Sequence, residues 1–248
     1  MLLVELHGDE PDTHIDLTDR RQIDALAEVV AGLPLAVHSV HSAFSKPSEE
    51  FWDMSQLDAG KREAALKRRE AVIWSAARLG AQHVVVHLGT RQRSEEQLAH
   101  SRASLARLVE VGRDAGVRIA VENLPPDHVG GCLAEVSGIL EDLDPDIAGF
   151  CLDTGHAMLG RNGVCEYIRA LGHRLCAIHW HANNSEEDTH IFPGANGTDW
   201  KDFLAALDEV GYQSPITIEA VPPARVSLDD AVREARRALR EKRAPRFL

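Results

Sequence analysis

Histidine and carboxylate side chains at the ends of apolar segments are the residues of this chain best suited to chemistry. The apolar run Ile147 to Leu152 ends on Asp153, and His156 follows three residues later. These residue types bind divalent transition metals, and they are costly to bury without a partner. Other apolar runs end in the same way, on His87, Glu122, His181 and Glu219. The pattern predicts a metal site assembled from several strand ends.

Nine candidate metal ligands stand at or just past such ends. They are His41, His87, Glu122, Asp153, His156, His181, Asp188, His190 and Glu219. One histidine or glutamate there is ordinarily a structural residue, but nine at repeating positions favour a functional cluster. Five imidazoles and four carboxylates suit Zn²⁺, Mn²⁺ or Fe²⁺ better than Mg²⁺ or Ca²⁺, which prefer oxygen ligands. The set would suffice for two or three ions.

Segments typical of strands and of amphipathic helices alternate along the chain. Most predicted strands are apolar on both faces, as in a parallel sheet that helices cover. The predicted strands are Leu2–His7, Leu35–His41, His83–His87, Val117–Glu122, Ile147–Asp153, Leu175–His181 and Ile216–Glu219. The predicted helices are Asp19–Ala31, Ala59–Leu79, Glu95–Ala115, Leu133–Leu143, Val164–Leu171, Trp200–Val210 and Leu228–Lys242.

This alternation predicts a single α/β domain over residues 1–248, close to the ~250 residues of one (β/α)8 TIM barrel. A doubly wound sheet is the alternative, but no Gly-rich phosphate turn follows an early strand. Side chains at successive strand ends converge only if the sheet closes, which favours the barrel. Because we predict seven strands, we expect an incomplete barrel whose gap lies between Leu2–His7 and Ile216–Glu219. The flanking strands would narrow it, or a partner chain, such as the second chain of a homodimer, would cover it.

Composition restricts the class of partner. The formal net charge is −12, with 39 acidic and 27 basic side chains, which does not suit a nucleic-acid footprint. The four cysteines form no CxxC pair, as expected for reduced thiols in the cytoplasm. We find no apolar segment of the ~18 residues that cross a membrane and no signal peptide, so we expect a cytoplasmic protein.

The chain resembles the xylose-isomerase-like TIM barrel superfamily, also called apurinic endonuclease family 2. That superfamily includes endonuclease IV and many sugar isomerases and epimerases. The most specific match is Asp153-Thr154-Gly155-His156. Further matching segments are His41-Ser42-Ala43-Phe44, Trp52-Asp53-Met54-Ser55, Val86-His87-Leu88-Gly89, Val121-Glu122-Asn123, His181-Ala182-Asn183-Asn184, Asp188 to Gly194 with Asp199-Trp200, and Ile218-Glu219. Family members normally have one more strand and helix before the segment that resembles Leu2–His7, so the resemblance also leads us to expect seven strands.

The resemblance implies three metal sub-sites. His41, His87 and Glu122 would form the first. Glu122, Asp153, His181 and Glu219 would form the second, and His156, Asp188 and His190 the third. In the sugar-isomerase branch only the second is occupied, and its two glutamates also act as acid and base. We expect the nearby His179 and His38 to be supporting or structural residues, and Glu5 and His7 to line the mouth of the barrel.

Two functions from different classes fit these residues. The favoured one is a sugar or sugar-phosphate isomerase or epimerase with one to three divalent ions, Zn²⁺ or Mn²⁺, and with Glu122 and Glu219 as catalytic base and acid. The alternative is an endonuclease IV-like trinuclear-zinc phosphodiesterase acting on abasic DNA or a smaller phosphoester. The nine-residue set favours the alternative, but the acidic charge and the scarcity of basic loops oppose it, Arg91-Gln92-Arg93 being the single basic loop cluster. A metal-binding protein without catalysis is a third possibility, which the paired glutamates disfavour.

Overall fold

The computed structural model describes residues 2–8, 15–42, 52–89, 94–184, 186–193 and 200–241. Within these ranges seven parallel strands form one sheet, and its spatial order follows the chain from β1 to β7. The strands are β1 (Leu2–His7), β2 (Leu35–His41), β3 (His83–Val86), β4 (Arg118–Glu122), β5 (Ala148–Asp153), β6 (Leu175–Trp180) and β7 (Thr217–Ile218). Because the order never reverses, the sheet is not doubly wound. The prediction of a TIM-type α/β barrel with seven strands is confirmed.

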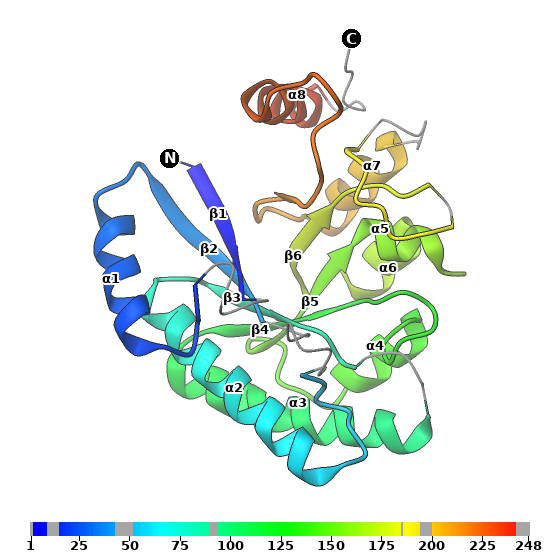
Figure 1. The fold of residues 1–248 in the computed structure, drawn as a ribbon. Coiled ribbons are helices and arrows are strands. Elements are labelled where there is room, and N and C mark those ends of the chain that lie inside the picture. The colour runs from blue at the N-terminus through cyan, green and yellow to red at the C-terminus, as the bar shows by residue number, and fades with distance from the viewer. Residues whose placement is uncertain are drawn as a thin grey trace.

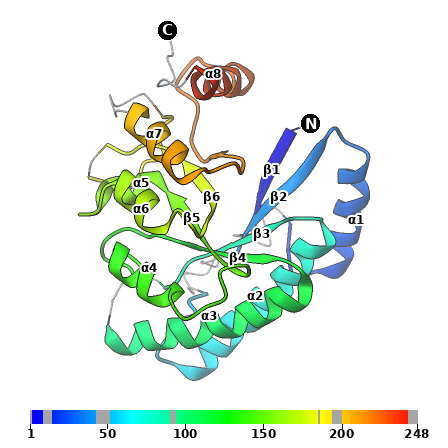
Figure 2. The same ribbon diagram turned by 180° about the vertical axis from the view of Figure 1, so that it is seen from behind.

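Helices cover the outside of the sheet (Figure 1), as the view from behind also shows (Figure 2). They are α1 (Arg20–Ala31), α2 (Ala59–Arg78), α3 (Glu95–Ala115), α4 (Leu133–Leu140), α5 (Thr154–Leu159), α6 (Val164–Leu171), α7 (Trp200–Val210) and α8 (Leu228–Arg240). The side chains of Asp19, Asp58 and Ser94 each accept a hydrogen bond from a backbone N–H in the first turn of α1, α2 and α3. Only α5 was not predicted, because its six residues are too few to show a helical period.

Alternation along the strands separates two layers of side chains. One face packs under the helices and forms the main core, with Val84, Val86, Ile119, Val121, Phe150, Leu152, Ile178 and Trp180 among its buried members. The other face points into the barrel, where a small cluster contains Val85, Ala120, Cys151, Cys176 and Ala177. Two residues beyond members of that cluster come His87, Glu122, Asp153 and His179. A period of two therefore aims these polar side chains into the barrel above a small apolar floor.

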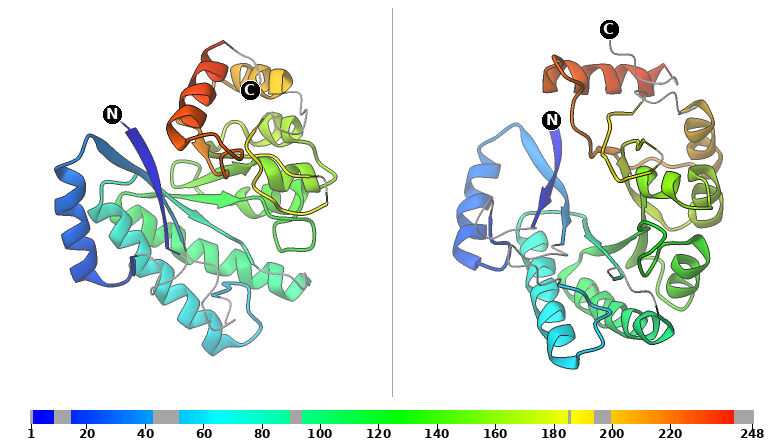
Figure 3. Two further views of the ribbon diagram at one scale, coloured as in Figure 1. Left: turned by 45° about the horizontal axis from the view of Figure 1, so that its top comes forward. Right: turned by 45° about the vertical axis from the view of Figure 1, so that its right-hand side comes forward.

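The sheet is open between its first and last strands. No backbone ladder joins β1 to β7 among the described residues. A cavity of about 360 Å³ lies there, lined by Leu3 and Val4 of β1, by Ile216 and Ile218 around β7, and by Leu239 of α8. The red α8 lies above this side of the sheet (Figure 3). Side chains narrow the gap, since His7 Nε2 lies 3.6 Å from Glu219 Oε1. Coverage by a partner chain stays a prediction.

Some sequence-based predictions concern residues outside the described ranges. The basic cluster Arg91-Gln92-Arg93 is among them, and so are Ala43, Phe44, Gly194 and Asp199 of the quoted motifs. Within the described ranges, no helix combines the length and apolar character needed to cross a bilayer. All four cysteines are free thiols, which agrees with the absence of a predicted disulfide framework.

Candidate metal centre

The nine predicted ligands gather at the carboxyl-terminal ends of the strands. His41, Glu122 and Asp153 are the last residues of β2, β4 and β5. The first residues after β3, β6 and β7 are His87, His181 and Glu219. Since the strands are parallel, their ends meet at one rim of the barrel, where enzymes of this fold carry their active sites. Five of the nine are buried, namely His41, Glu122, Asp153, His156 and His181.

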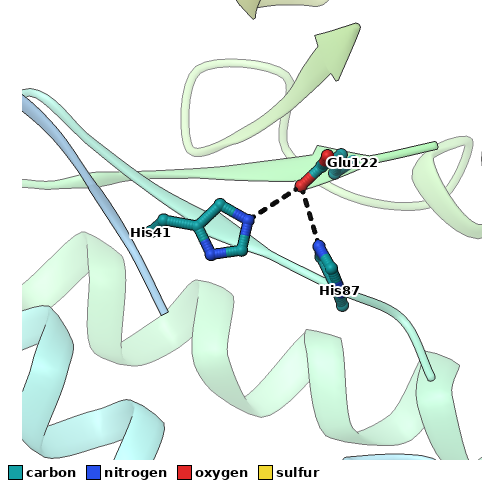
Figure 4. Close-up of side chains that lie close together, drawn as sticks. All are labelled: His41, His87 and Glu122. Carbon is teal, nitrogen blue, oxygen red and sulfur yellow. Dashed lines mark hydrogen bonds and ion pairs between the residues drawn. The ribbon is translucent and has the colours of Figure 1, made fainter. Parts of the chain in front are cut away.

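The first group consists of His41, His87 and Glu122 (Figure 4). Glu122 Oε2 lies 3.1 Å from His41 Nε2 and 3.0 Å from His87 Nε2. One ligand atom from each residue lies within 4.8 Å of the others, close enough to share an ion. This is the same trio that the resemblance implied for the first sub-site.

The second group forms around Asp153. His181 Nε2 lies 2.9 Å from both carboxylate oxygens of Asp153, and the backbone N–H of His156 donates to Asp153 Oδ1 over 2.6 Å. The Asn123 side chain pairs with the backbone of Asp153 through two hydrogen bonds of 2.9 Å. Asp153 is thus both a candidate ligand and the N-cap of α5, so the last residue of β5 and the first turn of α5 are fixed together.

The third group depends on a loop after β6. Asp188 Oδ2 lies 3.1 Å from His156 Nε2 and 3.3 Å from His190 Nε2. The loop is held by Asn183, whose Oδ1 accepts hydrogen bonds from the backbone of Thr189 and His190 at 2.7 and 3.3 Å. These contacts bring together the three residues implied for the third sub-site, although Asp188 and His190 remain partly exposed.

Glu219 reveals one difference from the implied grouping. Its Oε2 lies 2.8 Å from His179 Nδ1, and the close group of Glu122, Asp153 and Glu219 includes His179 rather than His181. His181 instead groups with His190 and Glu219, and its ring stacks on that of His190 at 4.2 Å. Both histidines point inward because they are two residues apart. The sequence analysis gave His181 as the ligand and His179 as a supporting residue, whereas the structure places His179 in the close group.

The site carries strongly perturbed charges. Burial opposes the charge on Glu122, yet His87 and His179 hold its pKa well below the usual value. Burial also disfavours a charged His156, but Asp153 and Asp188 raise its pKa to about 10. The hydrogen bond to Asp188 raises the pKa of His190 to about 9. The carboxylates therefore draw positive charge into the site, and a divalent cation could supply the same charge with release of protons.

The residues present fit a divalent metal. His181 Nδ1 is buried and makes no hydrogen bond, which leaves its lone pair or proton without a protein partner. In the part of the chain that the structure describes, three overlapping groups of imidazole and carboxylate atoms each lie within the span of one ion. Mixed nitrogen and oxygen donors of this kind suit Zn²⁺ or Mn²⁺.

Several supporting residues escaped the sequence reasoning. Asn123 holds Asp153 as described above, and its carbonyl oxygen also lies 2.9 Å from His156 Nδ1. Thr154 Oγ1 donates to the carbonyl oxygen of His181 over 2.6 Å, which joins the start of α5 to the end of β6. Asn123 follows Glu122 and Thr154 follows Asp153 in the quoted motifs. Their position next to candidate ligands could have indicated a supporting role, because residues that orient metal ligands often lie beside them.

Comparison with known proteins places this geometry in a family. Residues 3–242 match the family described as xylose isomerase-like TIM barrel. Over 189 residues the chain is 30% identical to the uncharacterized protein MJ1311 of Methanocaldococcus jannaschii, covering 73% of this chain and 63% of that one. Over 129 residues it is 30% identical to an L-ribulose 3-epimerase of Methylomonas sp., covering 51% of this chain and 43% of that one. The chain thus matches less than two thirds of the length of either relative.

Solved structures share the fold. A D-tagatose 3-epimerase-like protein superimposes with a TM-score of 0.81 at 24% identity, covering 97% of this chain and 87% of the other. The IOLI protein with a bound zinc atom gives a TM-score of 0.77 at 18% identity over the same shares of the two chains. With the family match spanning nearly every described residue, this chain belongs to the xylose isomerase-like TIM barrel family.

Proposed function

We propose that this protein is a divalent-metal-dependent epimerase or isomerase of a ketose or a related small sugar. The observation that carries the proposal is the convergence of two carboxylates on one imidazole. Glu122 Oε1 lies 3.3 Å and Glu219 Oε2 lies 2.8 Å from His179 Nδ1. Inverting a carbon beside a carbonyl needs a base and an acid near the same atom, and two glutamates around a shared polar space provide them.

The reaction follows from the roles of these side chains. A divalent cation held by Glu122, Asp153, His181 and Glu219 would polarise the sugar carbonyl and acidify the neighbouring C–H. One glutamate takes the proton from that carbon, and the other returns a proton to it. Return to the opposite face inverts the carbon and gives an epimer, whereas transfer to the adjacent carbon gives an isomer. No atom is gained or lost, and no oxidant is needed.

The relatives support this chemistry class. One is named an L-ribulose 3-epimerase and one solved structure a D-tagatose 3-epimerase-like protein, so both names refer to ketoses. The zinc atom in the IOLI structure supports a divalent metal in this fold. A sugar phosphate would need a basic group near the rim, and Lys201 at the start of α7 is a candidate for that contact.

The test is metal-dependent proton exchange. Metal-stripped protein is reloaded with Mn²⁺ or Zn²⁺ and incubated in D₂O with L-ribulose, D-tagatose or D-allulose. We expect NMR to show deuterium entering the carbon next to the carbonyl and chromatography to show a new epimer, both lost on chelation. Glu122→Gln is the matched control, because it keeps the shape of the side chain and removes the base. Metal-loaded protein that exchanges no proton in any ketose would contradict the proposal.

A second candidate is phosphodiester hydrolysis, and the group in Figure 4 favours it. A single-ion sugar epimerase has no use for a second complete cluster at His41, His87 and Glu122. Metal analysis of the purified protein separates the two functions. One ion per chain favours the epimerase, and three zinc ions with nicking of an abasic duplex favour the hydrolase.

A further inference from the structure

Two ionisable residues outside the nine predicted ligands lie inside the barrel. Glu5 is on β1, and its side chain is 4% exposed. His179 is on β6 and is fully buried. Burying ionisable groups in a barrel interior costs free energy unless each has partners, so the contacts of Glu5 and His179 indicate what the pair does.

The pair reaches from one open edge of the sheet to the other. His179 Nε2 lies 3.0 Å from Glu5 Oε1, and Nδ1 on the opposite side of the same ring lies 2.8 Å from Glu219 Oε2. Glu5 is itself anchored, because the Ser39 hydroxyl donates to its Oε2 over 2.6 Å. One imidazole thus connects β1 with Glu122 and with the residue that follows β7, across a gap that no backbone ladder closes among the described residues.

Glu219 needs such support more than the other ligands do. Glu122 and Asp153 end strands of five and six residues that pair on both sides. Glu219 follows a strand of two residues that pairs with β6, and the further backbone support among the described residues is an isolated bridge between Val221 and Ile191 and a contact of His190 Nδ1 with the Glu219 carbonyl oxygen at 3.0 Å. With so little backbone holding it, the position of its carboxylate depends on side-chain contacts. Ligating carboxylates in metalloproteins are themselves held by hydrogen-bonding partners outside the metal site, and these partners fix their orientation.

We infer that Glu5 and His179 are positioning residues that hold the Glu219 carboxylate at the metal centre across the open side of the barrel. The inference rests on the proposed metal-dependent function, which it deepens. In other barrels the ladder between first and last strands fixes both ends, and here a buried Glu5–His179–Glu219 chain takes over that task. Neither Glu5 nor His179 is assigned a contact with the sugar.

The test compares three variants of the whole chain. Glu5→Ala removes the anchor of His179, and Glu5→Gln keeps an acceptor without the charge. Val85→Ala is the matched control, because it removes volume from the apolar floor of the barrel and no polar contact. Mn²⁺ affinity of the metal-stripped proteins is measured by calorimetry, and kcat and KM with the best ketose are measured separately.

We expect Glu5→Ala to weaken Mn²⁺ binding about 10- to 100-fold and Glu5→Gln to fall between it and the wild type. In Glu5→Ala we expect kcat to fall while KM stays within about threefold of the wild type, because the substitution removes no contact that binds the sugar equally in the ground state and the transition state. Val85→Ala should lose thermal stability and keep its Mn²⁺ affinity. Should Glu5→Ala not fold, Glu5→Gln alone decides by the same affinity measurement.

The outcomes separate this inference from the proposed function. Unchanged Mn²⁺ affinity in the Glu5 variants, or an equal loss in Val85→Ala, overturns the positioning role even if ketoses are epimerised. Weakened affinity in the Glu5 variants alone supports the role even if no ketose reacts, in which case only the proposed substrate class fails. A wild-type protein that binds no divalent ion overturns both.

Discussion

Gly155→Ala gives a sharp test of how the site is built. Gly155 lies in α5, between Asp153 and His156. A Cβ added there would lie 2.0 Å from His181 Cε1 and 2.4 Å from His181 Nδ1, whereas ordinary contact begins at 3.4 Å. The His181 ring cannot move away without losing contacts, because its Nε2 lies 2.9 Å from Asp153 Oδ1 and its ring stacks on that of His190 with the centroids 4.2 Å apart.

The sign of the change in unfolding free energy in Gly155→Ala shows whether helix propensity or overpacking dominates. If helix propensity dominated, replacing a helical glycine with alanine would stabilise the protein by about 0.5–1 kcal/mol. Overpacking of a rigid site costs about 1–3 kcal/mol, so we expect a net loss of roughly 1–2 kcal/mol. For a chain of this size that corresponds to a melting temperature lower by about 2–8 °C. Displacement of His181 should also weaken Mn²⁺ binding about 10- to 100-fold.

Gly138→Ala is the matched control. Gly138 is also helical, in α4, and its added Cβ would lie 3.7 Å from Arg102 Nη2, which is ordinary contact. We expect it to raise the melting temperature slightly and leave Mn²⁺ affinity unchanged. Differential scanning fluorimetry and calorimetric Mn²⁺ titration measure both variants. A Gly155→Ala protein that is stabilised like the control and binds Mn²⁺ like the wild type would refute the reasoning.

Three further predictions concern catalysis, nucleic acid and pH. Glu122→Gln and Glu219→Gln should each lower turnover about 10²–10⁴-fold with the circular dichroism spectrum intact, and retention of more than roughly a tenth of wild-type turnover would contradict the acid–base assignment. With a net charge of −12, the protein should not bind an abasic duplex at submicromolar concentration in a gel-shift titration at physiological salt, and tight binding or nicking would favour the phosphodiesterase. Burial, reinforced by His38 and Arg118, lowers the pKa of His83 from 6.5 to about 4, with Glu5 acting in the opposite direction. As the pH drops from about 6.5 to about 4, His83 becomes protonated in the unfolded chain while it stays neutral in the folded one. The free energy of unfolding therefore falls, by about 2 kcal/mol between about pH 7.5 and about pH 5. In His83→Gln the free energy of unfolding, measured by urea denaturation at each pH, should depend less on pH in this range. An unchanged pH dependence would contradict the lowered pKa of His83.

The sequence by itself determined the sheet and most of the ligands. Largely continuous apolar runs were sufficient to place β1 and β2 at their observed bounds, because strands of a parallel sheet that helices cover are buried on both faces. The two-residue period of side chains along a strand puts Glu122 and Asp153 on the inner face. Parallel strands then bring their carboxyl-terminal ends to one rim, so the gathering of the six candidate ligands at strand ends could be foreseen from chain order. The places of His156, Asp188 and His190 depend on α5 and on the loop after β6.

The tertiary structure decided which side chains face one another. His179 and His181 lie on the same face of β6 and just beyond it, and the tertiary structure groups His179 with Glu122, Asp153 and Glu219 but His181 with His190 and Glu219. Glu5 lies 174 residues from His179 in the chain, and no local pattern could predict their contact. The open edge between β1 and β7 explains the pairing physically, because a gap without a backbone ladder leaves side chains to hold the two ends in place.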